Sequence, residues 1–233
     1  KFLRGGLKNW FRFRKEGVFF TDPDHTYIDE MVEIGDGTRV EPGVYLYADK
    51  TATIIGKGCK IGPMVVITDC KIGDNVYIGP KAAIKLCKVG DRVKIPHNCY
   101  LARTTIGEET NIGDNVTTSD FDGFEKHETF IGAKCFIGTF VDIIAPVTIG
   151  EECFIASRTR FSTPIAIPPH SFVYEEIRNR RPHIVCKVNC SFKLPGHWKW
   201  IWTRKPVDPQ KMQSFFSLIS ELVPDYPTWL KTP

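Results

Sequence analysis

The sequence repeats a short motif, in which isoleucine or valine is followed by glycine or alanine, at intervals of about six residues. The lead glycines of four successive groups, Gly56, Gly73, Gly90 and Gly107, follow one another at a constant step of 17 residues. The pairs are Ile34-Gly35, Ile55-Gly56, Ile61-Gly62, Ile72-Gly73, Ile78-Gly79, Val89-Gly90, Ile106-Gly107, Ile112-Gly113, Ile131-Gly132, Ile137-Gly138, Ile149-Gly150 and Ile155-Ala156. A six-residue period predicts a parallel β-helix, with three short strands per coil and the aliphatic residue pointing inward.

The residues that flank each pair agree with this fold. A compact side chain follows two or three residues after the glycine, at Cys59, Val76, Val93, Thr110, Val116, Cys135 and Cys153. Glycine in the second position predicts a backbone with positive φ. The alternative is that the pairs end hairpins of a β-sandwich, but a sandwich does not keep a fixed step over six turns. We therefore expect a stack of coils in which each coil covers its neighbour's core.

Composition sets further limits. The 233 residues suffice for one sizeable core, or for a core plus a small appendage, and the net charge is only +4. No run of 18 apolar residues exists, so no membrane span is expected. The basic and aromatic start at Lys1 does not resemble a signal peptide. The eight cysteines include no Cys-x-x-Cys pair, so we expect reduced packing residues in a cytoplasmic protein.

Three regions are predicted. Residues 1–17 place Leu3, Leu7, Trp10 and Phe11 on one face of a short helix. Residues 18–173 carry the β-helix, which is interrupted near Tyr47 to Thr51 and again from Ser119 to Thr129; loops that leave a regular scaffold often bind ligands. Residues 174–233 form a basic extension whose helix, residues 209–223, begins after Asp208 and covers the last coil.

Two features of the extension have more than one reading. Trp198, Trp200 and Trp202 alternate among basic residues, which suits packing onto the end of the stack better than a membrane or nucleic-acid surface. Cys186 and Cys190 do not have the spacing of common zinc fingers. We therefore expect no nucleic acid partner and no metal.

Several segments resemble one family of enzymes. They are Lys94–Leu101, Thr105–Gly113, Asp120–Thr129, Ala145–Gly150 and Asp22–Ile28. These segments resemble the acetyltransferase domain of the GlmU family over roughly residues 8 to 175. The resemblance implies an all-β, left-handed parallel β-helix that forms homotrimers and transfers an acetyl group from acetyl-CoA to glucosamine 1-phosphate or a similar amino-sugar phosphate. The glycine-rich loop of that family's uridylyltransferase half does not occur in the sequence, so the second activity is not expected here.

The resemblance also implies roles for individual residues. His97 falls at the position of the catalytic base, and an imidazole can accept the proton that an attacking amine loses at neutral pH. Substrate-binding positions are Lys85 for the phosphate, together with Tyr100, Asn111 and Lys126. Cofactor-binding positions are Asp120, Phe121, Thr139, Ser157, Arg158 and Arg160.

Two positions depart from the family pattern. Ile67 stands where the family keeps an arginine for the phosphate, which predicts weak binding of glucosamine 1-phosphate and rescue by Ile67→Arg. Asp120 stands where the family has asparagine, and adds a carboxylate near an anionic cofactor. These departures keep open a trimeric, non-catalytic scaffold with a degenerate site. A UDP-sugar acyltransferase fed by acyl carrier protein is another alternative, against which the loop with Asp122, Gly123 and Lys126 argues.

Overall fold

The structure is a computed structural model, and it describes residues 12–121, 123–161, 164–175 and 182–185. The chain divides into two compact units, Lys1–Cys186 and Lys187–Pro233, and all described residues belong to the first. The predicted helix over residues 209–223, the tryptophans near residue 200 and the pair Cys186 and Cys190 lie outside the described residues.

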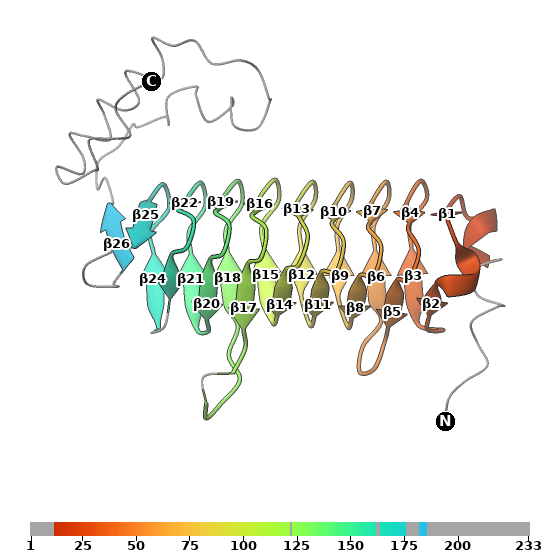
Figure 1. Cartoon of the computed structure of the whole chain (residues 1–233), viewed down its shortest axis with the longest axis horizontal. Coiled ribbons are helices and arrows are strands. Elements are labelled where there is room, and N and C mark those ends of the chain that lie inside the picture. Colours follow the sequence, from red (N-terminus) through yellow and green to blue (C-terminus); the bar gives the residue numbers. More distant parts are fainter. Residues whose placement is uncertain (1–11, 122, 162–163, 176–181, 186–233) are drawn as a thin grey trace, which may run out of the picture. The chain divides into compact units, whose positions relative to one another are not determined.

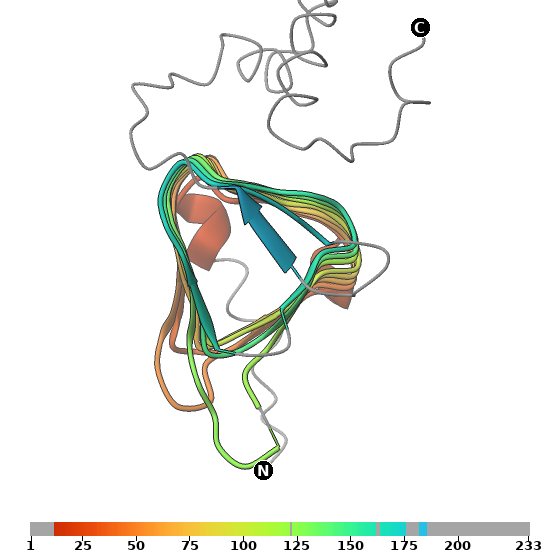
Figure 2. The same cartoon turned by 90° about the vertical axis from the view of Figure 1, so that its left-hand side faces the viewer.

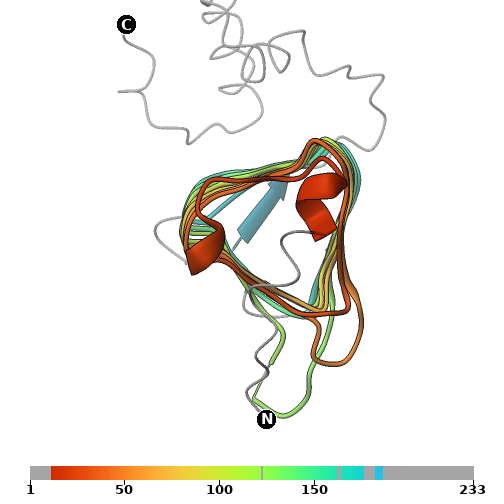
Figure 3. The same cartoon turned by 90° about the vertical axis from the view of Figure 1, so that its right-hand side faces the viewer.

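The described unit is a parallel β-helix whose coils form a triangular prism (Figures 1, 2 and 3). Each coil gives one strand to each of three sheets, here called faces A, B and C in chain order. Face A holds β1 (Phe19–Phe20), β4 (Arg39–Val40), β7 (Lys60–Ile61), β10 (Tyr77–Ile78), β13 (Lys94–Ile95), β16 (Asn111–Ile112), β19 (Phe136–Ile137), β22 (Phe154–Ile155), β25 (Phe172–Glu175) and β26 (Pro182–Val185).

Faces B and C have eight strands each. Face B holds β2 (Tyr27–Ile28), β5 (Tyr45–Tyr47), β8 (Val66–Thr68), β11 (Ala83–Lys85), β14 (Tyr100–Ala102), β17 (Thr117–Ser119), β20 (Asp142–Ile144) and β23 (Arg160–Phe161). Face C holds β3 (Val32–Ile34), β6 (Thr53–Ile55), β9 (Lys71–Ile72), β12 (Lys88–Val89), β15 (Thr104–Ile106), β18 (Thr129–Ile131), β21 (Val147–Ile149) and β24 (Ile165–Ile167). The predicted all-β, left-handed parallel β-helix is confirmed.

The two ends of the stack differ from its middle. A helical turn at residues 12–15 and the 3-10 helix Pro23–His25 lie at the first coils, and Phe13 is buried in the core. At the other end β26 pairs antiparallel with β25. The antiparallel pair ends the succession of parallel strands.

The aliphatic residue of each repeat points inward, as predicted. Ile61, Ile78, Ile95 and Ile112 stack in one buried row on face A, and equivalent rows line the other faces. Side chains alternate along a strand, so Lys60 and Lys94 on the same strands point outward. Residues one coil apart in the sequence therefore lie side by side and point in the same direction.

The glycine of the repeat has a different role from the one predicted. The positive φ belongs to the residue two positions later, as at Asn75 (φ 56°) after Gly73, and not to the repeat glycine. A Cβ on Gly107 would lie 2.3 Å from the backbone nitrogen of Ala133 in the next coil. Glycine is needed at the corner because the neighbouring backbone leaves no space for a side chain.

Buried polar atoms join the coils at the corner between faces B and C. The backbone N–H of Cys70 donates to Oγ1 of Thr53 (3.3 Å), that of Cys87 to Sγ of Cys70 (3.4 Å), and that of Thr104 to Sγ of Cys87 (3.4 Å). The six cysteines of the described part are free and buried, as predicted for packing residues.

Both predicted interruptions are loops at this same corner, where they project from the prism (Figures 2 and 3). Asp69 holds the first loop, because its Oδ1 accepts hydrogen bonds from the backbone N–H groups of Lys50 (2.9 Å) and Thr51 (3.0 Å). The second loop connects β17 to β18 and begins at Asp120. The regular coils therefore present two extra segments on one edge.

Candidate functional site

Four polar residues of the candidate site lie at the corner between faces A and B, one in each of four successive coils. His97, Asp114, Thr139 and Ser157 each follow a strand of face A by two residues. Backbone hydrogen bonds connect these turns: Asn115 donates to the His97 carbonyl (3.2 Å), Phe140 to Asp114 (2.9 Å) and Arg158 to Thr139 (2.9 Å). The structure thus places the predicted base and two predicted cofactor positions in one row.

The side chain of His97 lies beside a carboxylate of the next coil. Its Nδ1 lies 3.0 Å from Oδ1 of Asp114, and the two side chains are 52% and 37% exposed. A carboxylate only accepts hydrogen bonds, so a neutral ring with its hydrogen on Nδ1 suits this contact. The Nε2 atom of the neutral ring then holds the lone pair, and it is the atom that could accept a proton.

Thr139 and Ser157 lie in adjacent coils further along this corner, and they contact each other. The backbone N–H of Thr139 donates to Oγ of Ser157 (3.1 Å), and the Thr139 hydroxyl lies 3.3 Å from the same oxygen. Arg158 and Arg160 are both exposed, as expected, with the buried Thr159 between them, although Arg158 lies in the turn (φ 68°) and only Arg160 lies in a strand. The Arg158 guanidinium lies over the Phe140 ring at 5.3 Å, and Arg160 Nε lies 3.4 Å from Oδ2 of Asp142.

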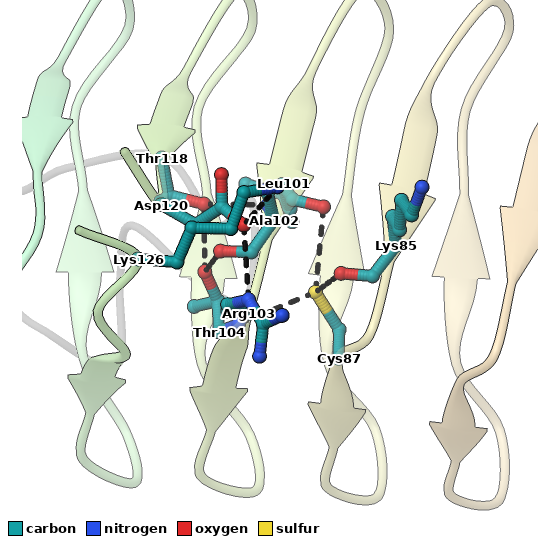
Figure 4. Close-up of polar contacts among 9 residues, drawn as sticks. All are labelled: Lys85, Cys87, Leu101, Ala102, Arg103, Thr104, Thr118, Asp120 and Lys126. Carbon is teal, nitrogen blue, oxygen red and sulfur yellow. Dashed lines mark hydrogen bonds and ion pairs between the residues drawn. The ribbon is translucent and has the colours of Figure 1, made fainter. Parts of the chain in front are cut away.

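The corner between faces B and C holds a charged cluster (Figure 4). Asp120 is 15% exposed, and its Oδ2 accepts a hydrogen bond from Nε of Arg103 (3.0 Å) and lies 3.6 Å from Nζ of Lys126. Phe121 forms an isolated antiparallel bridge with Lys126, and the backbone N–H of His127 donates to the Asp120 carbonyl (2.7 Å). Two cations thus neutralise the added carboxylate, so Asp120 need not repel an anionic ligand.

Lys85 lies one coil before Arg103 at the same corner, and its carbonyl accepts a hydrogen bond from the Arg103 N–H (2.9 Å). Its register neighbours are Thr68 in β8 and Ala102 in β14. Ile67 pairs instead with the core residue Ile84 and is 0% exposed. The prediction that Ile67 occupies a phosphate-binding position is therefore wrong, because a side chain at 67 points into the prism.

One chain does not bring all predicted substrate residues together. Tyr100 lies on face B with 46% exposure, whereas Asn111 lies on face A across the corner that carries His97. Lys85 and Lys126 lie at the opposite edge of face B. His97 and Ala102, the register partner of Lys85, are five residues apart, which is at most roughly 16 Å along an extended strand.

The sequence analysis missed Asp114 as a partner of His97, and it did not find Arg103 as a partner of Asp120. Both pairs are separated by 17 residues, the step of one coil in this region. The repeat therefore contained the signal: adding one coil to a candidate residue finds its neighbour along the prism.

The cysteine beside the histidine does not take part in nucleophilic chemistry. Burial raises the pKa of the Cys99 thiol to about 11. Its Sγ lies 3.3 Å from the Gly113 carbonyl inside the prism. At neutral pH the group is a buried thiol, which is a poor nucleophile.

The fold and these corners define a class: the chain is a hexapeptide-repeat β-helix protein. In sequence it is homologous to the bifunctional protein GlmU, and the part of GlmU that aligns is the acetyltransferase portion. It is 33% identical to GlmU from Enterococcus faecalis (strain ATCC 700802 / V583), over 58% of this chain and 36% of that protein. The chain spans about a third of the length of the curated relatives that it matches. The resemblance read from the sequence is thereby confirmed.

Further comparisons give partial or weak similarities. The family of the GMPPB C-terminal domain matches residues 46–121. Among solved structures, Francisella novicida UDP-N-acetylglucosamine acyltransferase is 14% identical with a TM-score of 0.38, and 86% of each chain is covered. The acetyltransferase domain of PglB from Neisseria gonorrhoeae FA1090, in complex with acetyl coenzyme A, is 15% identical with a TM-score of 0.35, covering 68% of this chain and 55% of that one. Scores this low carry no inference about activity.

Two features are absent from the described residues. None of their helices is long and apolar enough to cross a membrane. No group of three or more histidine, cysteine, aspartate or glutamate side chains in the described ranges could hold a metal ion.

Proposed function

We propose that the chain is an acetyl-CoA-dependent N-acetyltransferase that acts on an amino-sugar phosphate, with His97 as the general base. The observation that carries the proposal is the exposed His97 ring, whose Nδ1 lies 3.0 Å from Oδ1 of Asp114. In the tautomer with hydrogen on Nδ1, the Nε2 atom can accept a proton. Homology to the acetyltransferase portion of GlmU supports the reaction class.

His97 performs the proton transfers. As the sugar amine attacks the thioester carbonyl, a C–N bond forms and Nε2 takes the proton that the amine loses. The C–S bond then breaks, and the imidazolium returns the proton to the departing thiolate. No covalent enzyme intermediate is needed, because the thioester is already activated, and the raised pKa of Cys99 agrees with this.

The remaining residues bind the two substrates. Thr139 and Ser157 continue the row of His97, so acetyl-CoA would lie along this corner, with Arg158 and Arg160 as the cations nearest to its phosphates. Tyr100 and Asn111 flank His97 and would contact the sugar. The sugar phosphate is assigned to the cluster of Lys85 and Lys126.

A homotrimer would complete the site. The row that contains His97 lies at the corner between faces A and B, whereas Lys85 lies at the corner between faces B and C. The loop that carries Lys126 projects from this second corner (Figure 2). In a closed ring each copy presents one edge to its neighbour, and the same groove occurs three times. Each groove would then combine the base of one copy with the cations of another.

The two departures that favoured a non-catalytic scaffold have structural explanations. Ile67 is a core residue, and Asp120 is neutralised by Arg103 and Lys126. The direct test is incubation of the protein with acetyl-CoA and a panel of amino sugars and their phosphates, followed by mass spectrometry of the products. Addition of one acetyl group to an amino-sugar phosphate is the expected result, and no acetylation across the panel would refute the proposal.

The role of His97 has its own test. His97→Ala is expected to lower kcat by about 10² to 10⁴ because the amine loses its proton acceptor, with the KM for acetyl-CoA nearly unchanged. His170→Ala is the matched control, since His170 also contacts a carboxylate of an adjacent coil, but in a turn between faces C and A. An active His97→Ala enzyme would exclude this mechanism.

A further inference from the structure

His97 and Asp114 occupy equivalent positions in adjacent coils, and this stacking fixes which ring nitrogen meets the carboxylate. The backbone N–H of Asn115, next to Asp114, donates to the His97 carbonyl (3.2 Å). The main chains of the two turns are therefore joined beside the side-chain contact of 3.0 Å. Neither the carboxylate nor the ring needs a long flexible side chain to reach the other.

We infer that Asp114 is a positioning residue for the acetyl transfer reaction: it accepts the Nδ1 hydrogen of His97, holds the ring in one orientation and keeps the lone pair on Nε2. This inference rests on the proposed function for its kinetic consequence, but not for the tautomer itself. A neutral imidazole has two tautomers, and only the one with hydrogen on Nδ1 presents Nε2 as an acceptor. The carboxylate selects that tautomer, and it also stabilises the imidazolium that forms when Nε2 takes the proton.

The simplest competing explanation is that the exposed His97–Asp114 pair has no effect on the reaction, since exposed ion pairs contribute little even to stability. The protein contains its own control for that explanation. His170 Nδ1 lies 3.2 Å from Oε2 of Glu152, again between adjacent coils but at the corner between faces C and A, with exposures of 46% and 43%. The two pairs have similar contact distances and exposures, but they lie at different corners, and His97 is the histidine flanked by Tyr100 and Asn111.

The tautomer is measured by ¹⁵N NMR of histidine-labelled protein at a pH where the rings are neutral. The His97 signals are assigned by their disappearance in His97→Gln. The wild type is expected to show hydrogen on Nδ1. Asp114→Asn should retain this tautomer, because the amide oxygen still accepts a hydrogen bond, whereas Asp114→Ala should shift His97 toward the tautomer with hydrogen on Nε2.

The kinetic readout uses the same variants. Asp114→Ala should lower kcat by about tenfold, the value of roughly one hydrogen bond to a charged group at an exposed site, with the KM for acetyl-CoA within about twofold. Asp114→Asn should recover most of that loss. Glu152→Gln should leave kcat unchanged, because it breaks only the control pair.

The inference is overturned if Asp114→Ala keeps the wild-type tautomer of His97, or if its kcat equals that of the wild type while the wild type is active. It is also overturned if Glu152→Gln lowers kcat as much as Asp114→Ala does. If the wild type acetylates no sugar in the panel, the proposed function fails. The NMR comparison then still decides whether Asp114 fixes the tautomer.

Discussion

Ile67→Arg directly tests whether the side chain at position 67 points into the core of the prism. Ile67 is 0% exposed and lies in register with Leu46 and Ile84, which are themselves core residues. Removing a buried isoleucine side chain costs about 2–5 kcal/mol. The arginine that replaces it would bury a guanidinium without a partner, and such a charge carries a penalty of several kcal/mol even after relaxation. We therefore expect a loss of at least about 4 kcal/mol.

The assay is thermal unfolding followed by far-UV circular dichroism, at one protein concentration because association shifts the apparent Tm. For a chain of this size about 4 kcal/mol corresponds to a fall in Tm of roughly 8–16 °C. Val66→Arg is the matched control. Val66 precedes Ile67 in the same strand and points outward, half-buried, so we expect that variant to lose less than about 1 kcal/mol.

A Tm of Ile67→Arg within about 2 °C of the wild type would show that the side chain at position 67 faces solvent, and would refute its placement in the core. A lower KM for glucosamine 1-phosphate in a stable Ile67→Arg protein would have the same meaning. The rescue that the sequence predicted requires a side chain that faces solvent, and the register of β8 excludes it.

Three further predictions concern assembly, the cofactor and the thiols. Sedimentation at micromolar concentration should give a trimer, and a monomer would contradict the shared groove. Combined Arg158→Glu and Arg160→Glu should raise the KM for acetyl-CoA at low salt, an effect that weakens as salt is added; an unchanged KM would place the cofactor elsewhere. Burial raises the pKa of Cys99 from 9.0 to about 11, so the folded state binds its proton more tightly, and this contribution to stability is present below pH 9 and lost as the pH rises toward 11. Thiol labelling at pH 8 should accordingly modify Cys99 only after unfolding, and labelling of the native protein would show that the site opens.

The sequence by itself determined the architecture. A constant step of 17 residues means that residue i lies beside residue i + 17 in the next coil, and the pairing of Lys94 with Asn111 has this separation. Because side chains alternate in direction along each two- or three-residue strand, the pattern also predicts which residues point into the core. Both loops were also predicted, because extra residues cannot remain in a coil whose length the neighbouring coils fix.

The sequence did not reveal which side chains share an edge of the prism. Resemblance placed His97 and Lys85 in one site, but the coil carries them to opposite edges of face B, since a strand and a turn separate their positions. The resemblance also placed residue 67 at a phosphate-binding position, whereas the register turns Ile67 inward. The repeat pattern suggested that glycine is needed for its positive φ, whereas the reason is the backbone of the next coil, 2.3 Å from the Cβ that Gly107 lacks.

Asp114 and Arg103 illustrate the same division. Their positions follow from the repeat, but their contacts with His97 and Asp120 depend on side-chain direction at a corner, where alternation stops. A periodic sequence fixes neighbours along the stack because every coil has nearly the same length. The tertiary structure decides what those neighbours do, because the corner backbone aims each side chain outward, inward or toward the next coil.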